Sequence, residues 1–221
     1  MTDAGYRRIV EHYEDCLARH GDTHLGVDWP RLADAETRYR VMLGLIQPSA
    51  DEVSVLDFGC GAGHLYEFIR RNRHPGLLYS GLDLSPRFVE LCRSKHPEVS
   101  FECVDLMHHD IATSPRFDYV VANGVFTEKR ELSFDAMLGY FEAMIPRLFA
   151  LARIGIAFNV MSKAVDWERD DLFHLPLDTL ARFLTRSVTR HFAVRNDYGL
   201  YEYTVYAYRE PLAWPGLWSS A

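Results

Sequence analysis

Three glycines at alternate positions follow a short apolar run and an acid. In the sequence these are Gly59, Gly61 and Gly63, after Asp57. Apolar residues then recur at helical spacing, so the stretch predicts a strand, a tight turn and a helix. Glycine in such a turn lets the backbone approach a ligand at the helix N-terminus, where N–H groups attract anions. His64 stands where a dinucleotide fingerprint carries its third glycine, which separates this turn from the usual NAD pattern.

Two acids and an amide each stand just beyond a later predicted strand, at Asp83, Asp105 and Asn123. In an open parallel sheet, ligands bind outside the carboxyl ends of the strands. Asp83 follows Gly63 by twenty residues, which is the spacing at which an acid reaches the hydroxyls of a ribose. The pattern therefore predicts one continuous ligand-binding rim.

The elements that must position this rim alternate along the chain. Strands are predicted at 53–57, 77–83, 99–104, 117–122 and 154–160, and helices at 62–72, 86–95 and 133–151. This alternation predicts a doubly wound α/β fold, with a mostly parallel sheet and helices on both faces. A helix at 177–186 and two strand-like runs at 191–195 and 201–208 follow; the polar residues between the runs indicate an antiparallel pair.

Helical additions are expected ahead of this core. Residues 3–20 carry apolar side chains at spacings near 3 and 4, which predicts an amphipathic helix. A loop rich in Gly, Asp and His is expected at 20–30. Asp34 is then expected to cap a second helix that runs to about Leu45.

Composition and charge narrow the classes of partner. The chain of 221 residues is 48% hydrophobic and 25% charged, with a net charge of −7, which is typical of one globular α/β domain with additions. It has no Lys/Arg-rich run of the kind that binds nucleic acid. No stretch of about 18 apolar residues and no secretory leader stand out. We therefore expect a soluble cytoplasmic protein with neither a nucleic acid nor a membrane as partner.

The cysteines do not predict a metal site. Cys16, Cys60, Cys92 and Cys103 show no C-x-x-C pairing and no metal spacing, so reduced structural thiols are expected. The run His108-His109-Asp110 is similarly unpromising, because adjacent side chains diverge and no further ligand set is evident. No metal ion is expected.

Four segments together resemble the successive motifs of the class I S-adenosylmethionine-dependent methyltransferases. They are Leu56-Asp57-Phe58-Gly59-Cys60-Gly61-Ala62-Gly63, Gly81-Leu82-Asp83-Leu84-Ser85, Val104-Asp105-Leu106 and Phe117-Asp118-Tyr119-Val120-Val121-Ala122-Asn123. The resemblance covers roughly residues 53–160. It implies S-adenosylmethionine as cofactor and a seven-stranded sheet whose last strand is antiparallel. In these terms, 1–50 would be a helical cap or lid, 51–210 the methyltransferase domain and 211–221 a C-terminal tail.

The resemblance also implies roles for individual residues. The glycines would pass under the methionine part of the cofactor, Asp83 would bind both ribose hydroxyls, and Asp105 would accept from the adenine amino group. Arg38 is a candidate partner for the methionine carboxylate, although a solvated helix arginine is the alternative. The whole predicted cofactor set is Arg38, Phe58, Gly59, Cys60, Gly61, Gly63, Asp83, Leu84, Ser85, Asp105, Leu106, Asn123, Gly124 and Val125.

A general base is needed only when the acceptor must lose its proton early, because methyl transfer is an in-line displacement at an activated carbon. The candidates for this catalytic role are His174, Asp166 and Glu128, with His24 and His64 as further possibilities. Each of these side chains has an alternative role in the fold or in contacting substrate.

The acceptor is expected to be a small molecule, methylated on oxygen or nitrogen, with sugar or secondary-metabolite pathways as examples. The run Asn123-Gly124-Val125-Phe126 stands where base-methylating enzymes carry an Asn/Asp-Pro-Pro-aromatic motif. Two alternatives remain open. One is a nicotinamide-dependent oxidoreductase, and the other is a non-catalytic S-adenosylmethionine-binding module that regulates or scaffolds a partner. The oligomeric state is left open.

Overall fold

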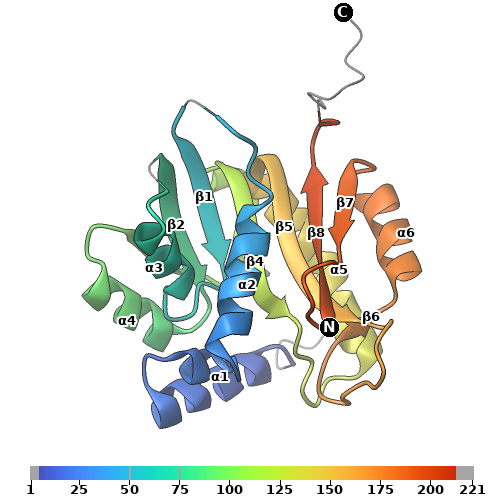
Figure 1. Cartoon of the computed structure of the whole chain (residues 1–221), viewed down its shortest axis with the longest axis horizontal. Coiled ribbons are helices and arrows are strands. Elements are labelled where there is room, and N and C mark those ends of the chain that lie inside the picture. Colours follow the sequence, from blue (N-terminus) through green and yellow to red (C-terminus); the bar gives the residue numbers. More distant parts are fainter. Residues whose placement is uncertain (1–4, 50, 75, 213–221) are drawn as a thin grey trace, which may run out of the picture.

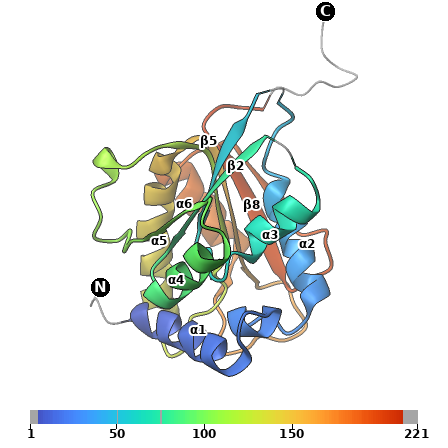
Figure 2. The same cartoon turned by 90° about the vertical axis from the view of Figure 1, so that its left-hand side faces the viewer.

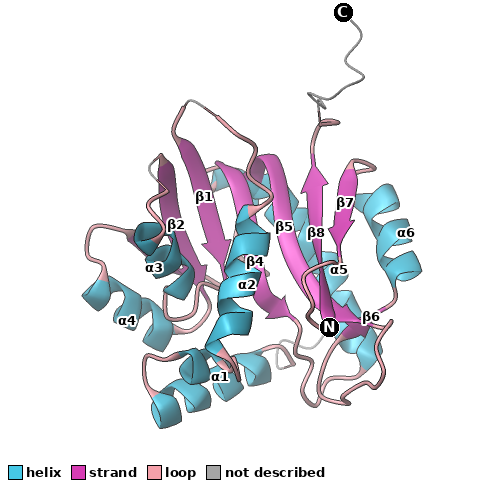
Figure 3. Ribbon diagram, in the orientation of Figure 1, coloured by secondary structure: helices cyan, strands magenta, loops and turns pink. Residues whose placement is uncertain are grey.

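A computed structural model of the chain describes residues 5–49, 51–74 and 76–212. Within them, one sheet runs in the order β3-β2-β1-β4-β5-β8-β7, and a short β6 pairs with β5 (Figures 1 and 3). The strands are β1 (Val53–Phe58), β2 (Leu77–Asp83), β3 (Ser100–Cys103), β4 (Phe117–Phe126), β5 (Ala152–Ser162), β6 (His174–Leu175), β7 (Phe192–Arg195) and β8 (Glu202–Tyr208). Strand β8 pairs antiparallel with both β5 and β7, and the other pairs of these strands are parallel. The predicted fold class, including the antiparallel final strand, is confirmed.

Helices cover both faces of this sheet. They are α1 (Arg7–His20), α2 (Leu32–Leu43), α3 (His64–Arg71), α4 (Pro86–Lys95), α5 (Phe134–Leu151) and α6 (Leu177–Ser187), with short 3-10 helices η1 (His24–Val27) and η2 (Ile111–Thr113). Figure 2 shows α5 on one side of the sheet, and α2 and α3 on the other. None of the described helices is both long and apolar enough to cross a membrane.

Alternating side chains of β1 explain why both faces are covered. Val53 and Val55 belong to the core beneath α2 and α3, whereas Leu56 and Phe58 belong to the core beneath α5 and α6. Successive side chains of a strand point to opposite faces, so a strand that is apolar on both must be buried on both.

Helix caps were predictable where a short polar side chain precedes the helix. Ser85 accepts a hydrogen bond from the Phe88 N–H at 3.3 Å, directly before Pro86 at the start of α4. The cap predicted at Asp34 is wrong, because α2 begins two residues earlier, at Leu32. Asp34 instead lies in the first turn, where its negative charge still complements the helix dipole.

Several loops contain more structure than predicted. The 20–30 loop includes η1, whose N-cap Thr23 accepts from the Gly26 N–H. Strand β4 continues past residue 122 through an irregular segment to Phe126, and the insertion after β5 returns to the sheet as β6. Most of the predicted C-terminal tail, 211–221, falls outside the described residues, which end at 212.

Phe141 of α5 packs against four phenylalanine rings, those of Phe126, Phe158, Phe173 and Phe183. We expect Phe141→Ala to reduce the free energy of unfolding by about 3–5 kcal/mol, because the cavity it leaves cannot fill completely. Urea denaturation followed by circular dichroism measures this change. Leu177→Ala, at a residue that is 48% exposed, is the control and should change stability by no more than about 0.5 kcal/mol. Similar midpoints for the two variants would contradict the central position of Phe141.

Candidate active site

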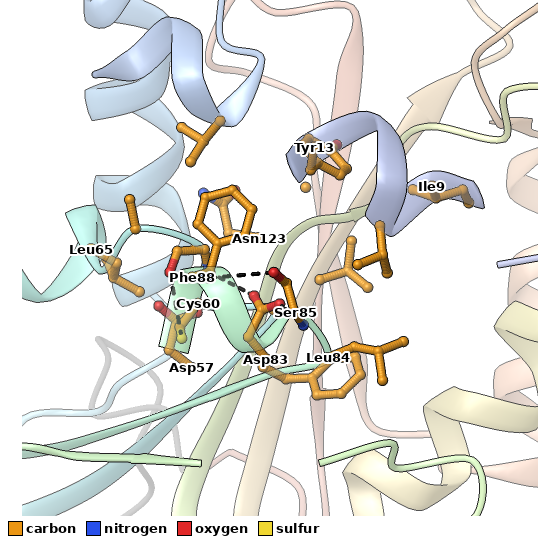
Figure 4. Close-up of a pocket in the computed structure, with 18 of the residues that line it drawn as sticks. Ile9, Tyr13, Asp57, Cys60, Leu65, Asp83, Leu84, Ser85, Phe88 and Asn123 are labelled. Atoms are coloured by element: carbon orange, nitrogen blue, oxygen red, sulfur yellow. Dashed lines mark hydrogen bonds between the residues drawn. The ribbon is translucent and has the colours of Figure 1, made fainter. Parts of the chain in front are cut away.

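A cavity lies at the carboxyl ends of the parallel strands (Figure 4). Its floor comes from the β1–α3 turn and the ends of β2, β3 and β4, and residues from α1, η1 and α2 line it as well. Most of the predicted cofactor set lines it, namely Phe58, Gly59, Cys60, Gly61, Asp83, Leu84, Ser85, Asp105, Leu106, Asn123, Gly124 and Val125. Residues of all four sequence motifs thus line a single cavity.

The glycine turn requires its glycines. Gly59, Gly61 and Gly63 have φ values of 73°, 50° and 78°, which lie in the left-handed region that other residues rarely adopt. A Cβ on Gly59 would also stand 2.5 Å from the Val125 Cγ2 atom. Gly63 does not line the cavity, and its role is local, as the N-cap of α3.

Asp83 links this turn to the end of β2. Its Oδ2 atom accepts from the Gly61 N–H at 2.8 Å, and its Oδ1 atom accepts from the Ser85 N–H at 2.9 Å. Burial raises the pKa of Asp83, although these backbone hydrogen bonds act in the opposite direction. The carboxylate therefore lies in the cavity wall as a hydrogen-bond acceptor, and it receives only backbone donors from the protein. It can accept further hydrogen bonds from a ligand that supplies hydroxyl groups.

Asp57 lies behind the turn at the end of β1. The Tyr79 hydroxyl donates to its Oδ2 atom at 2.7 Å, and burial raises the pKa of Asp57 to about 7. Neither Asp57 nor Asp83 forms an ion pair with a Lys or Arg in the described part of the chain. The floor of the cavity is therefore acidic.

Helix α1 docks on Asp105. The Tyr6 hydroxyl and an Arg7 guanidinium N–H donate to the Asp105 Oδ2 atom at 2.8 and 3.0 Å, and the Met107 N–H donates to Oδ1 at 3.1 Å. The Tyr6 ring stacks on Tyr140, with centroids 5.1 Å apart. The N-terminal helix therefore contributes directly to the part of the site where the resemblance places adenine.

Asn123 carries a buried polar atom without a partner in the structure. Its Oδ1 atom has no hydrogen bond among the described residues, and the residue lines the cavity in Figure 4. An orphaned buried acceptor is unfavourable unless a ligand or water satisfies it. Next to it, Gly124 has a φ of 81°, and a Cβ there would stand 2.7 Å from the Trp29 ring. The unpartnered Asn123 oxygen is an acceptor that suits the amine of a cofactor.

Arg38 lies outside the cavity. Its guanidinium pairs with the buried Glu202 carboxylate at 2.8 Å and stacks over the Trp29 ring at 4.2 Å. An Arg that compensates a buried charge is not available to a ligand carboxylate without breaking that pair. The structure thus favours a structural role for Arg38, in which it supports the Trp29 side of the cavity.

The three candidate bases are not brought together. His174 is buried, and its Nδ1 atom contacts the Ser162 carbonyl at 2.6 Å while Nε2 accepts from the Arg169 N–H at 3.3 Å. Asp166 is exposed, and Glu128 is buried against Arg130 at 3.2 Å. None of the three lines the cavity. His174 and Asp166 therefore do not fit the catalytic role predicted for them.

The inner surface of the N-terminal segment forms part of the site, and Tyr6, Ile9, Val10 and Val27 were not among the predicted site residues. The lining there is apolar and aromatic and consists of Tyr6, Ile9, Val10, Tyr13, Val27 and Trp29. The helical spacing of residues 6, 9, 10 and 13 did predict an apolar face. The spacing alone could not show whether this apolar face covers a cavity or packs against a filled core.

Comparisons with known proteins agree with this geometry. The family model for a methyltransferase domain matches residues 56–143. A protein of Mycobacterium tuberculosis that is named as a methyltransferase is 29% identical over 162 residues, which cover 71% of this chain and 93% of the relative.

Two solved structures share the fold. Magnesium protoporphyrin IX methyltransferase from Synechocystis, with bound S-adenosylmethionine, has a TM-score of 0.63 at 17% identity, over 95% of this chain and all of that one. A Burkholderia thailandensis N1-methyltransferase, with bound 1,6-didemethyltoxoflavin and S-adenosylhomocysteine, has a TM-score of 0.61 at 18% identity, over 94% of this chain and 91% of that one.

The matched domain spans the glycine turn, Asp83, Asp105 and Asn123, the same residues that meet in the cavity. The unpartnered Asn123 oxygen and the left-handed glycines fit a cofactor that brings donors close to the backbone. The chain therefore contains an S-adenosylmethionine-dependent methyltransferase domain with the class I fold.

Proposed function

We propose that this enzyme methylates a small-molecule acceptor on oxygen or nitrogen, and that the acceptor carries no anionic group near the reacting atom. The observation that carries this proposal is the charge of the cavity. Among the described residues that line it there are three carboxylates, one histidine and no Lys or Arg. An anionic acceptor would lose its water there without gaining a cationic partner, which is strongly unfavourable.

The N-terminal wall supports an acceptor with apolar or aromatic surface. Tyr13, Val27 and Trp29 line the cavity, with Trp29 beside Gly124 and Val27 beside Gly61. Aromatic walls bind flat apolar compounds through large contact areas. The two solved structures described above are named for action on magnesium protoporphyrin IX and on 1,6-didemethyltoxoflavin. Both names are consistent with a small acceptor in this fold.

We assign the cofactor contacts from the same geometry. Asp83 would accept hydrogen bonds from the ribose hydroxyls, Asp105 would accept from the adenine amino group, and the Asn123 Oδ1 atom would accept from the methionyl amine. The cofactor, when bound, supplies a methyl group on a sulfonium. The carboxylates and the amide oxygen suit that positive charge, because none of them repels a cation.

Alignment of the acceptor is the main task left to the side chains. Tyr13 lines the cavity, and burial, together with the negative charges of Glu128 and Asp28, holds its pKa well above the usual value. A phenol in that environment stays protonated at neutral pH, so Tyr13 would orient an acceptor as a hydrogen-bond donor and would not act as a base. Of the predicted bases, His64 lines the cavity, with its Nε2 atom 2.8 Å from Asp22 Oδ1, whereas Glu128 lies outside the lining, close enough to Tyr13 for its charge to raise the pKa of the phenol.

Replacing Asp83 tests the cofactor assignment. We expect Asp83→Ala to weaken binding of S-adenosylhomocysteine by about 1.5–3 kcal/mol, roughly ten- to hundredfold in Kd, through loss of charge-assisted hydrogen bonds. Isothermal titration calorimetry measures this. Glu102→Ala, at an exposed residue of the neighbouring strand, is the control and should bind like the wild type. An unchanged Kd for Asp83→Ala would show that the ribose lies elsewhere.

A screen of matched acceptor pairs tests the proposed substrate class. Each pair consists of an aromatic phenol or amine and the same compound with an added carboxylate, and release of S-adenosylhomocysteine is the readout. We expect turnover to favour the uncharged member by at least tenfold, because the cavity offers no cation to a carboxylate. Preference for the carboxylated members would refute the acceptor class. Tight cofactor binding with no turnover across the screen would favour the alternative of a non-catalytic binding module.

A further inference from the structure

Three potential metal ligands meet beneath α1, outside the cavity described above. His12 and Cys16 are four residues apart on α1, so they lie on the same face of that helix. Asp28 directly follows η1 in a left-handed conformation, with a φ of 57°. The ligand atoms of all three lie within 4.8 Å of one another. The site thus joins α1 to the segment that leads into α2.

The geometry of the three side chains converges on one nitrogen atom. The Asp28 Oδ2 atom lies 2.7 Å from His12 Nε2, and the Cys16 Sγ atom lies 3.7 Å from the same Nε2. In a Cys-His-Asp catalytic arrangement the carboxylate and the sulfur would contact opposite ring nitrogens, so that the imidazole relays a proton. Here the carboxylate and the sulfur both approach Nε2, so the ligand atoms of all three side chains lie around one point, where a metal ion could bind them.

The distances fit a small tetrahedral ion. With bonds of about 2.0–2.3 Å to nitrogen, oxygen and sulfur, the ligand atoms of a tetrahedral zinc site stand about 3.3–3.6 Å apart. The sulfur–nitrogen distance is already 3.7 Å. The Asp28 oxygen, now 2.7 Å from His12 Nε2, must move away by about half an ångström to reach the separation expected of a tetrahedral site. The Asp28 side chain is 36% exposed and has room to turn.

The charges of the three side chains match those of a divalent ion. Cys16 is only 3% exposed, and an Arg19 N–H donates to its sulfur at 3.4 Å. Such a donor, which contacts the sulfur without binding the metal, stabilises the negative charge of a thiolate ligand. One thiolate and one carboxylate would neutralise a divalent cation, which suits a site that is partly removed from water.

We propose that His12 Nε2, Cys16 Sγ and Asp28 Oδ2 bind one divalent ion of the zinc class, with water in the fourth position. Bound there, the ion would fix α1 against η1, the two elements that contribute Tyr13 and Val27 to the cavity wall. The site is distinct from the cofactor contacts, so the proposal stands or falls independently of the function proposed above.

Cobalt(II) provides the test, because it substitutes for zinc and absorbs light when a thiolate binds it. The metal-free, reduced full-length protein is titrated with CoCl2. We expect one equivalent to bind, with a sulfur-to-cobalt charge-transfer band in the near ultraviolet and visible bands of tetrahedral cobalt. Zinc chloride should then displace the cobalt and abolish the bands. Cys16→Ser should remove the charge-transfer band, and His12→Ala should weaken binding more than tenfold.

Cys103→Ser is the matched control, since Cys103 is exposed and lies on β3 away from this cluster. That variant should keep the band and the affinity. The proposal is overturned if the folded wild type binds no stoichiometric cobalt, or if the band survives in Cys16→Ser and is lost in Cys103→Ser. Circular dichroism and binding of S-adenosylhomocysteine establish that each variant is folded. If Cys16→Ser fails to fold, Asp28→Asn replaces it and should also weaken cobalt binding more than tenfold.

Discussion

The hydrogen bond from the Gly61 N–H to Asp83 fixes the arrangement on which the rest of the site depends. Strands β1 and β2 are in parallel register, with Phe58 opposite Leu82, and the N–H groups of Gly59 and Cys60 both donate to the Leu82 carbonyl. The turn after β1 is therefore tied to the end of β2 at three backbone groups. Because the glycines adopt left-handed conformations there, the backbone can fold sharply enough for helix α3 to begin directly behind the turn.

This arrangement places two carboxylates near each other, Asp57 buried and Asp83 half-buried in the cavity wall, and removal from water raises the pKa of both. Uncompensated acids at the floor of a cavity are unfavourable in the absence of ligand. The Tyr79 hydroxyl and two backbone N–H groups supply neutral donors, and no lining Lys or Arg within the described residues adds a cation. A ligand that is itself cationic and rich in hydroxyl and amine donors supplies what the protein lacks, which explains why a sulfonium cofactor suits this site.

Much of the core was predictable because its determinants are local. The alternating apolar strands and the twenty-residue interval from Gly63 to Asp83 are local features of the sequence, and they predicted the parallel sheet and the cofactor rim. Roles that depend on long-range partners were not predictable. Arg38 is satisfied by Glu202, which is 164 residues away. No spacing along the chain reveals such a partner in advance.

Helix α1 shows why one periodic pattern can serve two surfaces. Residues 6, 9, 10 and 13 turn their side chains into the cavity, while His12 and Cys16, on a neighbouring face, meet Asp28. The spacing between cysteines did not predict a metal site, because the spacing that matters is the four-residue interval from His12 to Cys16. The third ligand depends on the left-handed Asp28 backbone, whose N–H donates to carbonyls of η1. The position of α1 over the cavity and its attachment to η1 are therefore set by the same side-chain periodicity, and a change on either face of this helix alters the wall that an acceptor meets.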